Sequence, residues 1–197
     1  MIELLEGMQD SNEGSLVSFP ERVELIRQLV LQVKPKKIVE IGFNAGHSCK
    51  LILDTVLEVN DPEYQSQTKE VYIFDICTHQ CVEPNFEILK AFYQKHNINM
   101  TLIKGSSFDT LTKFLEDKDQ LDFVNIDGCH STESVINDFY AVRNKIALKG
   151  VIYVDDYAIY ALPLNFPEMT KAIENLDWTS FMINFFPGCM WGIKTWE

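Results

Sequence analysis

Short apolar runs alternate with segments of helical periodicity through most of this 197-residue chain, which limits the folds open to it. The apolar runs are expected to be strands at residues 37–41, 71–76, 100–103, 121–126 and 151–154. Helices are expected at residues 19–33, 47–57, 86–96 and 108–115. A further helix should begin at Ser131 or Thr132 and end at Lys149–Gly150, with a buried stripe of Val135, Phe139, Val142 and Ile146. The sequence therefore predicts an α/β fold with a doubly wound, mostly parallel sheet and helices on both faces.

The C-terminal part departs from this alternation. A helix is expected at 167–176, followed by two strands at 178–186 and 190–196 that turn at Pro187–Gly188 and form an antiparallel hairpin. The polar stretch 58–70 is expected to be a long surface loop. A chain of 197 residues is long enough for one hydrophobic core, so we expect a single domain over residues 1–197, with a lead-in helical segment at 1–35.

Composition narrows the class of partner. A net charge of −12 without a basic run argues against nucleic acid or an anionic membrane as a partner. No apolar run reaches the roughly 18 residues of a membrane helix, and the acidic start is unlike a secretion signal. We therefore expect a cytoplasmic protein that acts on a small molecule. Homo-oligomers are compatible with this composition, which specifies no oligomeric state.

The cysteines point to a reducing compartment. There are five, an odd number with no paired framework. The pattern Cys77-x-His79-x-Cys81 is a weak zinc candidate, because no second Cys/His pair at zinc-finger spacing completes it.

A glycine turn follows the first expected strand, in Glu40-Ile41-Gly42-Phe43-Asn44-Ala45-Gly46. Glycine lets the backbone turn tightly and approach a ligand. A dinucleotide site would need glycine where Asn44 and His47 stand, and Glu40 would lie beside its pyrophosphate. Glu40 suits a cationic ligand instead, such as the ammonium of the methionine part of S-adenosylmethionine (SAM). The motif therefore favours SAM over NAD, while His47 either touches the cofactor or faces solvent.

Acidic residues end three of the later strands. Asp75 ends the second strand and is placed to accept hydrogen bonds from ribose hydroxyls, with helix capping as the alternative. Asp127 ends the fourth strand and Asp155–Asp156 the fifth, so three carboxylates meet if these strands are neighbours about 4.8 Å apart. Such oxygen ligands select Mg²⁺ or another hard divalent cation rather than zinc. The alternative is that one Asp caps a helix and the pair only turns the chain.

His130 follows Asp127 by three residues at the same edge. Its unperturbed pKa of about 6.5 suits a general base that takes the proton of an acceptor hydroxyl, which a bound metal would make more acidic. Orientation of Asp127 and a plain helix-entry role are the alternatives. Asp127 and His130 are thus the expected catalytic residues.

The segment from Ile38 to Ser48 resembles the first motif of SAM-dependent methyltransferases with the Rossmann-like fold, particularly the catechol O-methyltransferase-like and macrolide-sugar O-methyltransferase-like groups. The resemblance runs from about Lys36 to Tyr157. It implies a methionine-binding segment, a ribose acid, and a turn that borders adenine. The residues implied in cofactor binding are Glu40, Gly42, Phe43, Asn44, Gly46, Ser48, Asp75, Gly105, Ser106, Ser107 and Asp127. The resemblance also implies that Asp127, Asp155 and Asp156 occupy the metal-ligand positions of these methyltransferases. His130 departs from the catechol enzymes, in which the base at this position is a lysine.

These observations predict SAM-dependent, divalent-metal-dependent O-methylation of a small hydroxylated acceptor, such as a sugar or a vicinal diol. The alternatives are a metal-independent methyltransferase acting on another nucleophile, a non-catalytic binding module, and a dinucleotide dehydrogenase. A lid is expected from residues 157–167 or from a partner subunit. The aromatic residues that could wall an acceptor pocket, but are also typical of a core, are Tyr157, Tyr160, Phe185, Phe186 and Trp191.

Overall fold

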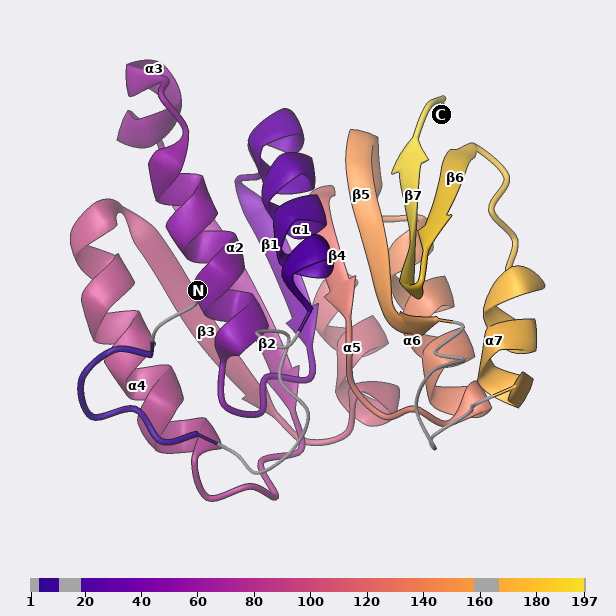
Figure 1. Cartoon of the computed structure of the whole chain (residues 1–197), viewed down its shortest axis with the longest axis horizontal. Coiled ribbons are helices and arrows are strands. Elements are labelled where there is room, and N and C mark those ends of the chain that lie inside the picture. The colour runs from indigo at the N-terminus through magenta and orange to yellow at the C-terminus, as the bar shows by residue number, and fades with distance from the viewer. Residues whose placement is uncertain (1–3, 11–18, 158–166, 197) are drawn as a thin grey trace.

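The computed structural model describes residues 4–10, 19–157 and 167–196 (Figure 1). Its strands are β1 (Lys37–Ile41), β2 (Lys69–Asp75), β3 (Ile98–Lys104), β4 (Leu121–Ile126), β5 (Ile146–Tyr157), β6 (Phe181–Phe186) and β7 (Gly188–Lys194). Its helices are α1 (Pro20–Val33), α2 (His47–Glu58), α3 (Pro62–Ser66), α4 (Val82–Tyr93), the 3₁₀ turn η2 (Gln94–His96), α5 (Ser107–Leu115), α6 (Thr132–Arg143) and α7 (Pro167–Glu174).

The seven strands of the described residues form one sheet in the order β3-β2-β1-β4-β5-β7-β6. Strands β1 to β5 are parallel, while β7 runs antiparallel to both β5 and β6. The predicted α/β class, with its mostly parallel sheet and antiparallel C-terminal hairpin, is therefore confirmed. Because strand order reverses beside β1, the carboxyl ends of β1 and β4 border the crevice where ligands bind in such sheets.

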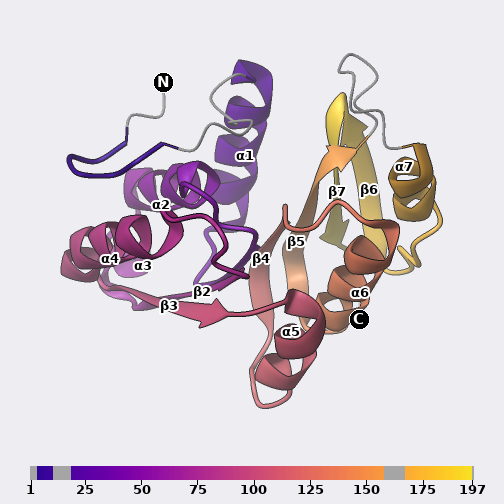
Figure 2. The ribbon, with the colours of Figure 1, turned by 90° about the horizontal axis from the view of Figure 1, so that it is seen from below.

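Helices cover both faces of the sheet, as the view from below shows (Figure 2). One apolar cluster joins α1, α2 and α4 to one face, through residues such as Val30, Ile52 and Leu89. A second cluster joins α5, α6 and α7 to the other face, through residues such as Leu111 and Phe139. Because side chains alternate along a strand, each buried strand contributes to both clusters.

Two sequence expectations are wrong in detail. The expected loop at 58–70 contains α3 and the first residues of β2, because Pro62 suits a first helical turn and Asp61 caps it by accepting from the Tyr64 amide at 3.1 Å. The expected helix up to Lys149 ends at Arg143, and Ile146 pairs with Leu121 in the sheet. The spacing of Val142 and Ile146 fits a helix, yet both are buried by different elements of one core.

Candidate active site

The turn after β1 has the left-handed backbone that its glycines allow. The φ angles are +91° at Gly42, +48° at Asn44 and +87° at Gly46, and α2 begins immediately after Gly46. A Cβ at Gly42 would lie 2.0 Å from the carbonyl oxygen of Asp127, so only glycine fits between β1 and the end of β4. The turn is thus packed directly against the strand end that carries the first predicted metal ligand.

Glu40 is buried beneath this turn, with 1% of its surface exposed. Its Oε1 accepts hydrogen bonds from the Ser48 hydroxyl and, at 3.3 Å, from the amide of Asn125, the residue that pairs with it on β4. Among the described residues, Oε2 of Glu40 has no hydrogen-bond partner. Burial raises the pKa of this carboxyl group to about 7. A buried acid with one oxygen unpaired is a site that a cationic group would stabilise.

Asp75 accepts hydrogen bonds from the turn itself. Its Oδ2 accepts from the backbone amides of Phe43 at 2.8 Å and Asn44 at 3.1 Å, and its Oδ1 accepts from the amide of Cys77 at 2.6 Å. The ring of Phe43 is buried and packs edge-on against Phe86. The predicted cofactor residues Phe43 and Asn44 therefore meet Asp75 through their backbone, while the phenyl ring belongs to the core.

The turn after β3 lies beside Asp75. Gly105, with a φ of +125°, donates its amide to the carbonyl oxygen of Asp75 at 2.9 Å. Ser106 then precedes α5, and Ser107 is its first residue. The structure thus brings the predicted adenine turn next to the predicted ribose acid.

Strand alternation sets the direction of the acids at β4 and β5. In β5, Val151 and Tyr153 face α1, whereas Ile152 and Val154 face the opposite side of the sheet. Asp155 continues the face of Tyr153, whose hydroxyl donates to Asp155 Oδ1 at 3.1 Å. By strict alternation, Asp156 would point to the opposite face.

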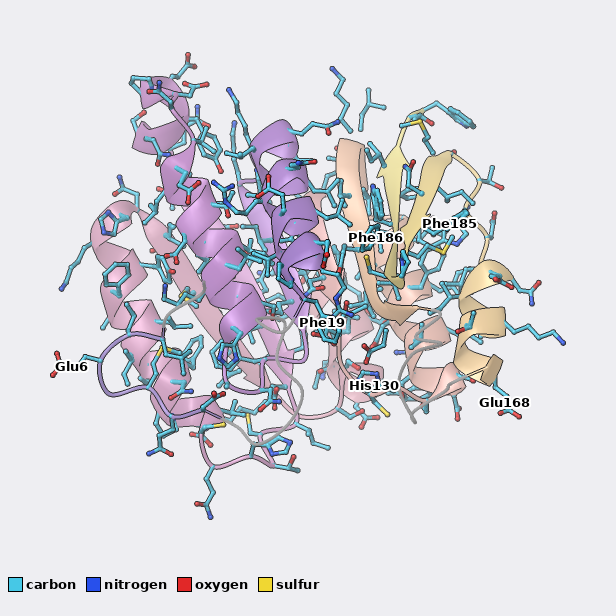
Figure 3. The ribbon with its side chains drawn as sticks, in the orientation of Figure 1. Glu6, Phe19, His130, Glu168, Phe185 and Phe186 are labelled. Carbon is cyan, nitrogen blue, oxygen red and sulfur yellow. The ribbon has the colours of Figure 1, made fainter. Side chains whose placement is uncertain are left out.

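A β-bulge changes the direction of Asp156. The pairing of β5 with β7 passes from Asp155 to Tyr157 and skips Asp156, which has a φ of +59°. Bulges of this kind re-aim side chains beside active sites. The result is that Asp156 Oδ2 lies 2.7 Å from Nδ1 of His130, and this hydrogen bond raises the pKa of His130. Figure 3 shows His130 near the lower edge of the sheet.

Asp127, His130 and Asp156 form a possible metal-binding group. One ligand atom from each of these residues lies within 4.8 Å of the others. Burial raises the pKa of Asp127, and the charges of Asp155 and Asp156 raise it further. The three predicted carboxylates do converge on one edge, but Asp155 is not a member of this group.

Arg22 of α1 pairs with Asp155 instead. Its Nη2 lies 3.0 Å from Asp155 Oδ2, and its Nη1 lies 3.8 Å from Asp156 Oδ1 and donates to the carbonyl oxygen of Gly188 at 3.1 Å. Only 5% of the Arg22 surface is exposed. Sequence reasoning missed this residue, since a single arginine in an amphipathic helix is ordinary. It missed Asn125 too, although a polar residue inside the apolar run 121–126 was a usable signal.

The weaker candidates lie apart from this group. His47 Nε2 is 3.5 Å from an oxygen of Asp10, and Cys81 contacts the carbonyl oxygen of Asn44 through its sulfur at 3.8 Å. The segment Cys77–Cys81 contributes no zinc-like group among the described residues. Phe185, on β6, is 72% exposed (Figure 3), while Phe186 and Trp191 pack against the core. Tyr160 and most of the expected lid lie outside the described residues.

Comparison with known proteins assigns the family. Residues 39–157 match a family model described as a methyltransferase domain. This match spans more than half of the chain, which therefore belongs to that family of methyltransferase domains. No curated protein sequence is similar enough to count as a match.

Solved structures share the fold at low sequence identity. CalS11, a TDP-rhamnose 3′-O-methyltransferase of calicheamicin biosynthesis, is 16% identical, with a TM-score of 0.67 over 90% of this chain and 79% of that one. TomG from Streptomyces achromogenes, solved with SAM, is 13% identical, with a TM-score of 0.65 over 89% and 80%. An O-methyltransferase from Bacillus cereus, solved with SAH, is 14% identical, with a TM-score of 0.61 over 94% and 84%.

Family and fold together confirm the sequence prediction of a SAM-dependent methyltransferase with a Rossmann-like fold. None of the helices in the described ranges is long and apolar enough to cross a membrane. The cytoplasmic location remains a prediction.

Proposed function

We propose that the protein transfers the methyl group of SAM to a hydroxyl of a small acceptor, with a divalent metal ion bound at the edge formed by β4 and β5. The observation that supports this proposal best is a row of acids along neighbouring strand ends. The row consists of Asp75 on β2, Glu40 on β1, Asp127 after β4, and Asp155 and Asp156 on β5. One buried arginine does not balance five acids, so cationic ligands would stabilise this edge.

The two ends of the row suit two cationic groups. Near β1, the unpaired Oε2 of Glu40 is placed to receive the ammonium of SAM, and Asp75 keeps the glycine turn in the shape that borders the cofactor. We assign the ribose hydroxyls to Asp75 and the adenine to the turn at Gly105 and Ser106. In the transfer, the acceptor oxygen forms a bond to the methyl carbon while the carbon–sulfur bond breaks and its electron pair stays on sulfur, which leaves SAH, and the hydroxyl proton passes to water.

The group at the other end of the row fits a divalent ion. Two carboxylates and one imidazole, with ligand atoms within 4.8 Å of one another, are a donor set that such ions accept. An ion held there would supply Lewis acidity, lowering the pKa of the acceptor hydroxyl. Asp127 would join both halves of the site, because its backbone contacts Gly42 and its carboxylate lies beside Asp156.

Calorimetric titration of SAM into metal-free protein tests the first part of the proposal. We expect saturable binding that weakens in Glu40→Gln, because the unpaired buried carboxylate then becomes a neutral amide. Ser131→Ala, at the cap of α6 beyond the carboxyl end of β4, is a control that should bind SAM normally. Absence of SAM binding to the wild-type protein would refute the proposed function.

A transfer assay tests the second part. Sugars and catechols are incubated with protein and SAM, and methylated products are detected by mass spectrometry before and after exhaustive EDTA treatment. We expect methyl ethers that disappear with EDTA and return with added metal.

A metal-independent methyltransferase is the second candidate, and the ion pair between Arg22 and Asp155 favours it, since Arg22 already supplies a cation at this edge. Activity that survives EDTA would select this alternative. Methylation of amines or thiols without methylation of hydroxyls would also select it.

A further inference from the structure

The possible metal ligands in the structure differ from those that the sequence predicts. The sequence predicts three carboxylates as ligands and His130 as a base. In the structure, the possible ligand atoms belong to Asp127, His130 and Asp156, while Asp155 contacts Arg22 at 3.0 Å.

The ion pair of Asp155 is well enclosed. The side chains of Arg22 and Asp155 are 6% and 9% exposed, and Asp155 also accepts from the Tyr153 hydroxyl. Both of its oxygens therefore have protein partners. Moving Asp155 into a metal shell would leave the buried guanidinium without its closest acid, and an uncompensated buried charge is costly.

The position of His130 suits a ligand. Its Nδ1 lies 2.7 Å from Asp156 Oδ2, and two atoms bound at neighbouring positions of an octahedral ion at about 2.1 Å lie about 3 Å apart. His130 stands in the short loop between β4 and α6, immediately before Ser131, which caps α6 by accepting from the Ser134 amide at 3.2 Å. The cap fixes the loop beside the end of β4, and this keeps His130 within 4.8 Å of ligand atoms of Asp127 and Asp156.

We propose that Asp127, His130 and Asp156 are the protein's metal ligands, that Arg22 keeps Asp155 out of the ligand set, and that the site consequently prefers a divalent transition-metal ion such as Mn²⁺, Fe²⁺ or Co²⁺ to Mg²⁺ or Ca²⁺. An imidazole ligand favours transition metals, whereas an all-oxygen set favours hard cations. The proposal rests on the proposed function for the existence of a metal site, and it makes His130 a ligand instead of the base that the sequence predicts.

Electron paramagnetic resonance of Mn²⁺ bound to the protein, without SAM or acceptor, tests this ligand set. Electron spin-echo modulation detects a directly bound imidazole nitrogen. We expect this nitrogen signal in the wild-type protein, its loss in His130→Gln, and its retention in His47→Gln, a matched histidine at the glycine turn. We also expect His130→Gln to weaken Mn²⁺ binding by at least about tenfold.

The acids provide the second comparison. Asp156→Asn should abolish tight Mn²⁺ binding, whereas Asp155→Asn should leave the nitrogen signal in place and weaken Mn²⁺ binding by less than His130→Gln does. In His130→Asp, an all-oxygen set, the preference for Mn²⁺ over Mg²⁺ should fall. Circular dichroism checks that each variant is folded.

Several results would overturn the proposal: no Mn²⁺ binding, no nitrogen signal in the wild type, or a signal that persists in His130→Gln. Loss of binding in a folded Asp155→Asn with normal binding in His130→Gln would restore the carboxylate set. If Asp155→Asn does not fold, the spectra of the wild type and of His130→Gln still decide whether His130 is a metal ligand. Because SAM takes no part, failure to bind SAM would refute the proposed function without changing this result.

Discussion

Replacing Arg22 by methionine should destabilise the protein far more than the same replacement at Arg27, which lies further along the same helix, α1. Methionine keeps much of the apolar stem of arginine but removes the charge that faces Asp155 and Asp156. Breaking a buried ion pair by removing one partner costs about 3–5 kcal/mol. Arg27 pairs with Glu24 and Glu58 at the surface, where an ion pair contributes about 0–1 kcal/mol.

The measurement is urea unfolding followed by circular dichroism in metal-free buffer, at pH 8 and again at pH 5.5. Burial raises the pKa of Asp155, although Arg22 opposes this shift. A raised folded-state pKa means that ionising the buried acid costs stability: the cost is complete above the folded-state pKa, shrinks as the pH falls below it, and is absent only below the unfolded-state pKa. Without Arg22 the pKa of Asp155 rises further, so the loss of stability in Arg22→Met should shrink at pH 5.5.

A loss in Arg22→Met that lies within about 1 kcal/mol of the loss in Arg27→Met would refute this reasoning, because it would place the acid pair in an environment as well solvated as the surface. A loss that grows on acidification would refute it as well. Added Mn²⁺ should restore part of the stability of Arg22→Met, because a bound cation stabilises the folded state by mass action.

Three further predictions concern other parts of the site. Burial raises the pKa of Glu40 to about 7, so lowering the pH from 7.5 to 6 should protonate this carboxylate and weaken the binding of cationic SAM several-fold. Calorimetry should find little pH dependence of SAM binding in Glu40→Gln. Gly42→Ala combines a φ of +91° with a Cβ 2.0 Å from a backbone oxygen, so it should cost about 2–5 kcal/mol in urea unfolding. Gly105→Ala, which shares the positive φ but brings its Cβ no closer than 3.4 Å to Thr110, should cost less, and equal losses would contradict the role of the close contact. At the bulge, the free energy of unfolding of Asp156→Gly should exceed that of Asp156→Ala by about 1 kcal/mol, because glycine adopts a φ of +59° without the strain that alanine has there. Equal unfolding midpoints for the two variants would show that the left-handed backbone is not strained at this position.

The expected strands and the observed strands agree where the pattern had one interpretation. β1 and β4 match the expected ranges residue for residue, since each is a short apolar run bounded by polar residues. The prediction that the helix includes Ile146 is wrong, because the spacing of four residues between Val142 and Ile146 fits both one helix and two separate buried elements. Periodicity reports that a side chain is buried without saying which element buries it.

The sequence by itself determined the alternation of strands and helices, and with it the edge at which Glu40, Asp75, Asp127 and the pair Asp155–Asp156 must gather. This follows from local periodicity, because parallel strands joined by crossover helices place all their carboxyl ends on one side.

The tertiary structure alone decided which groups those acids contact. The bulge that turns Asp156 toward His130 depends on the pairing of β5 with β7, whose residues lie more than 30 positions apart in the chain. The partner of Asp155 is an arginine 133 residues away. Contacts at such separations are fixed by the packing of α1 on the sheet, and no local pattern in the sequence encodes them.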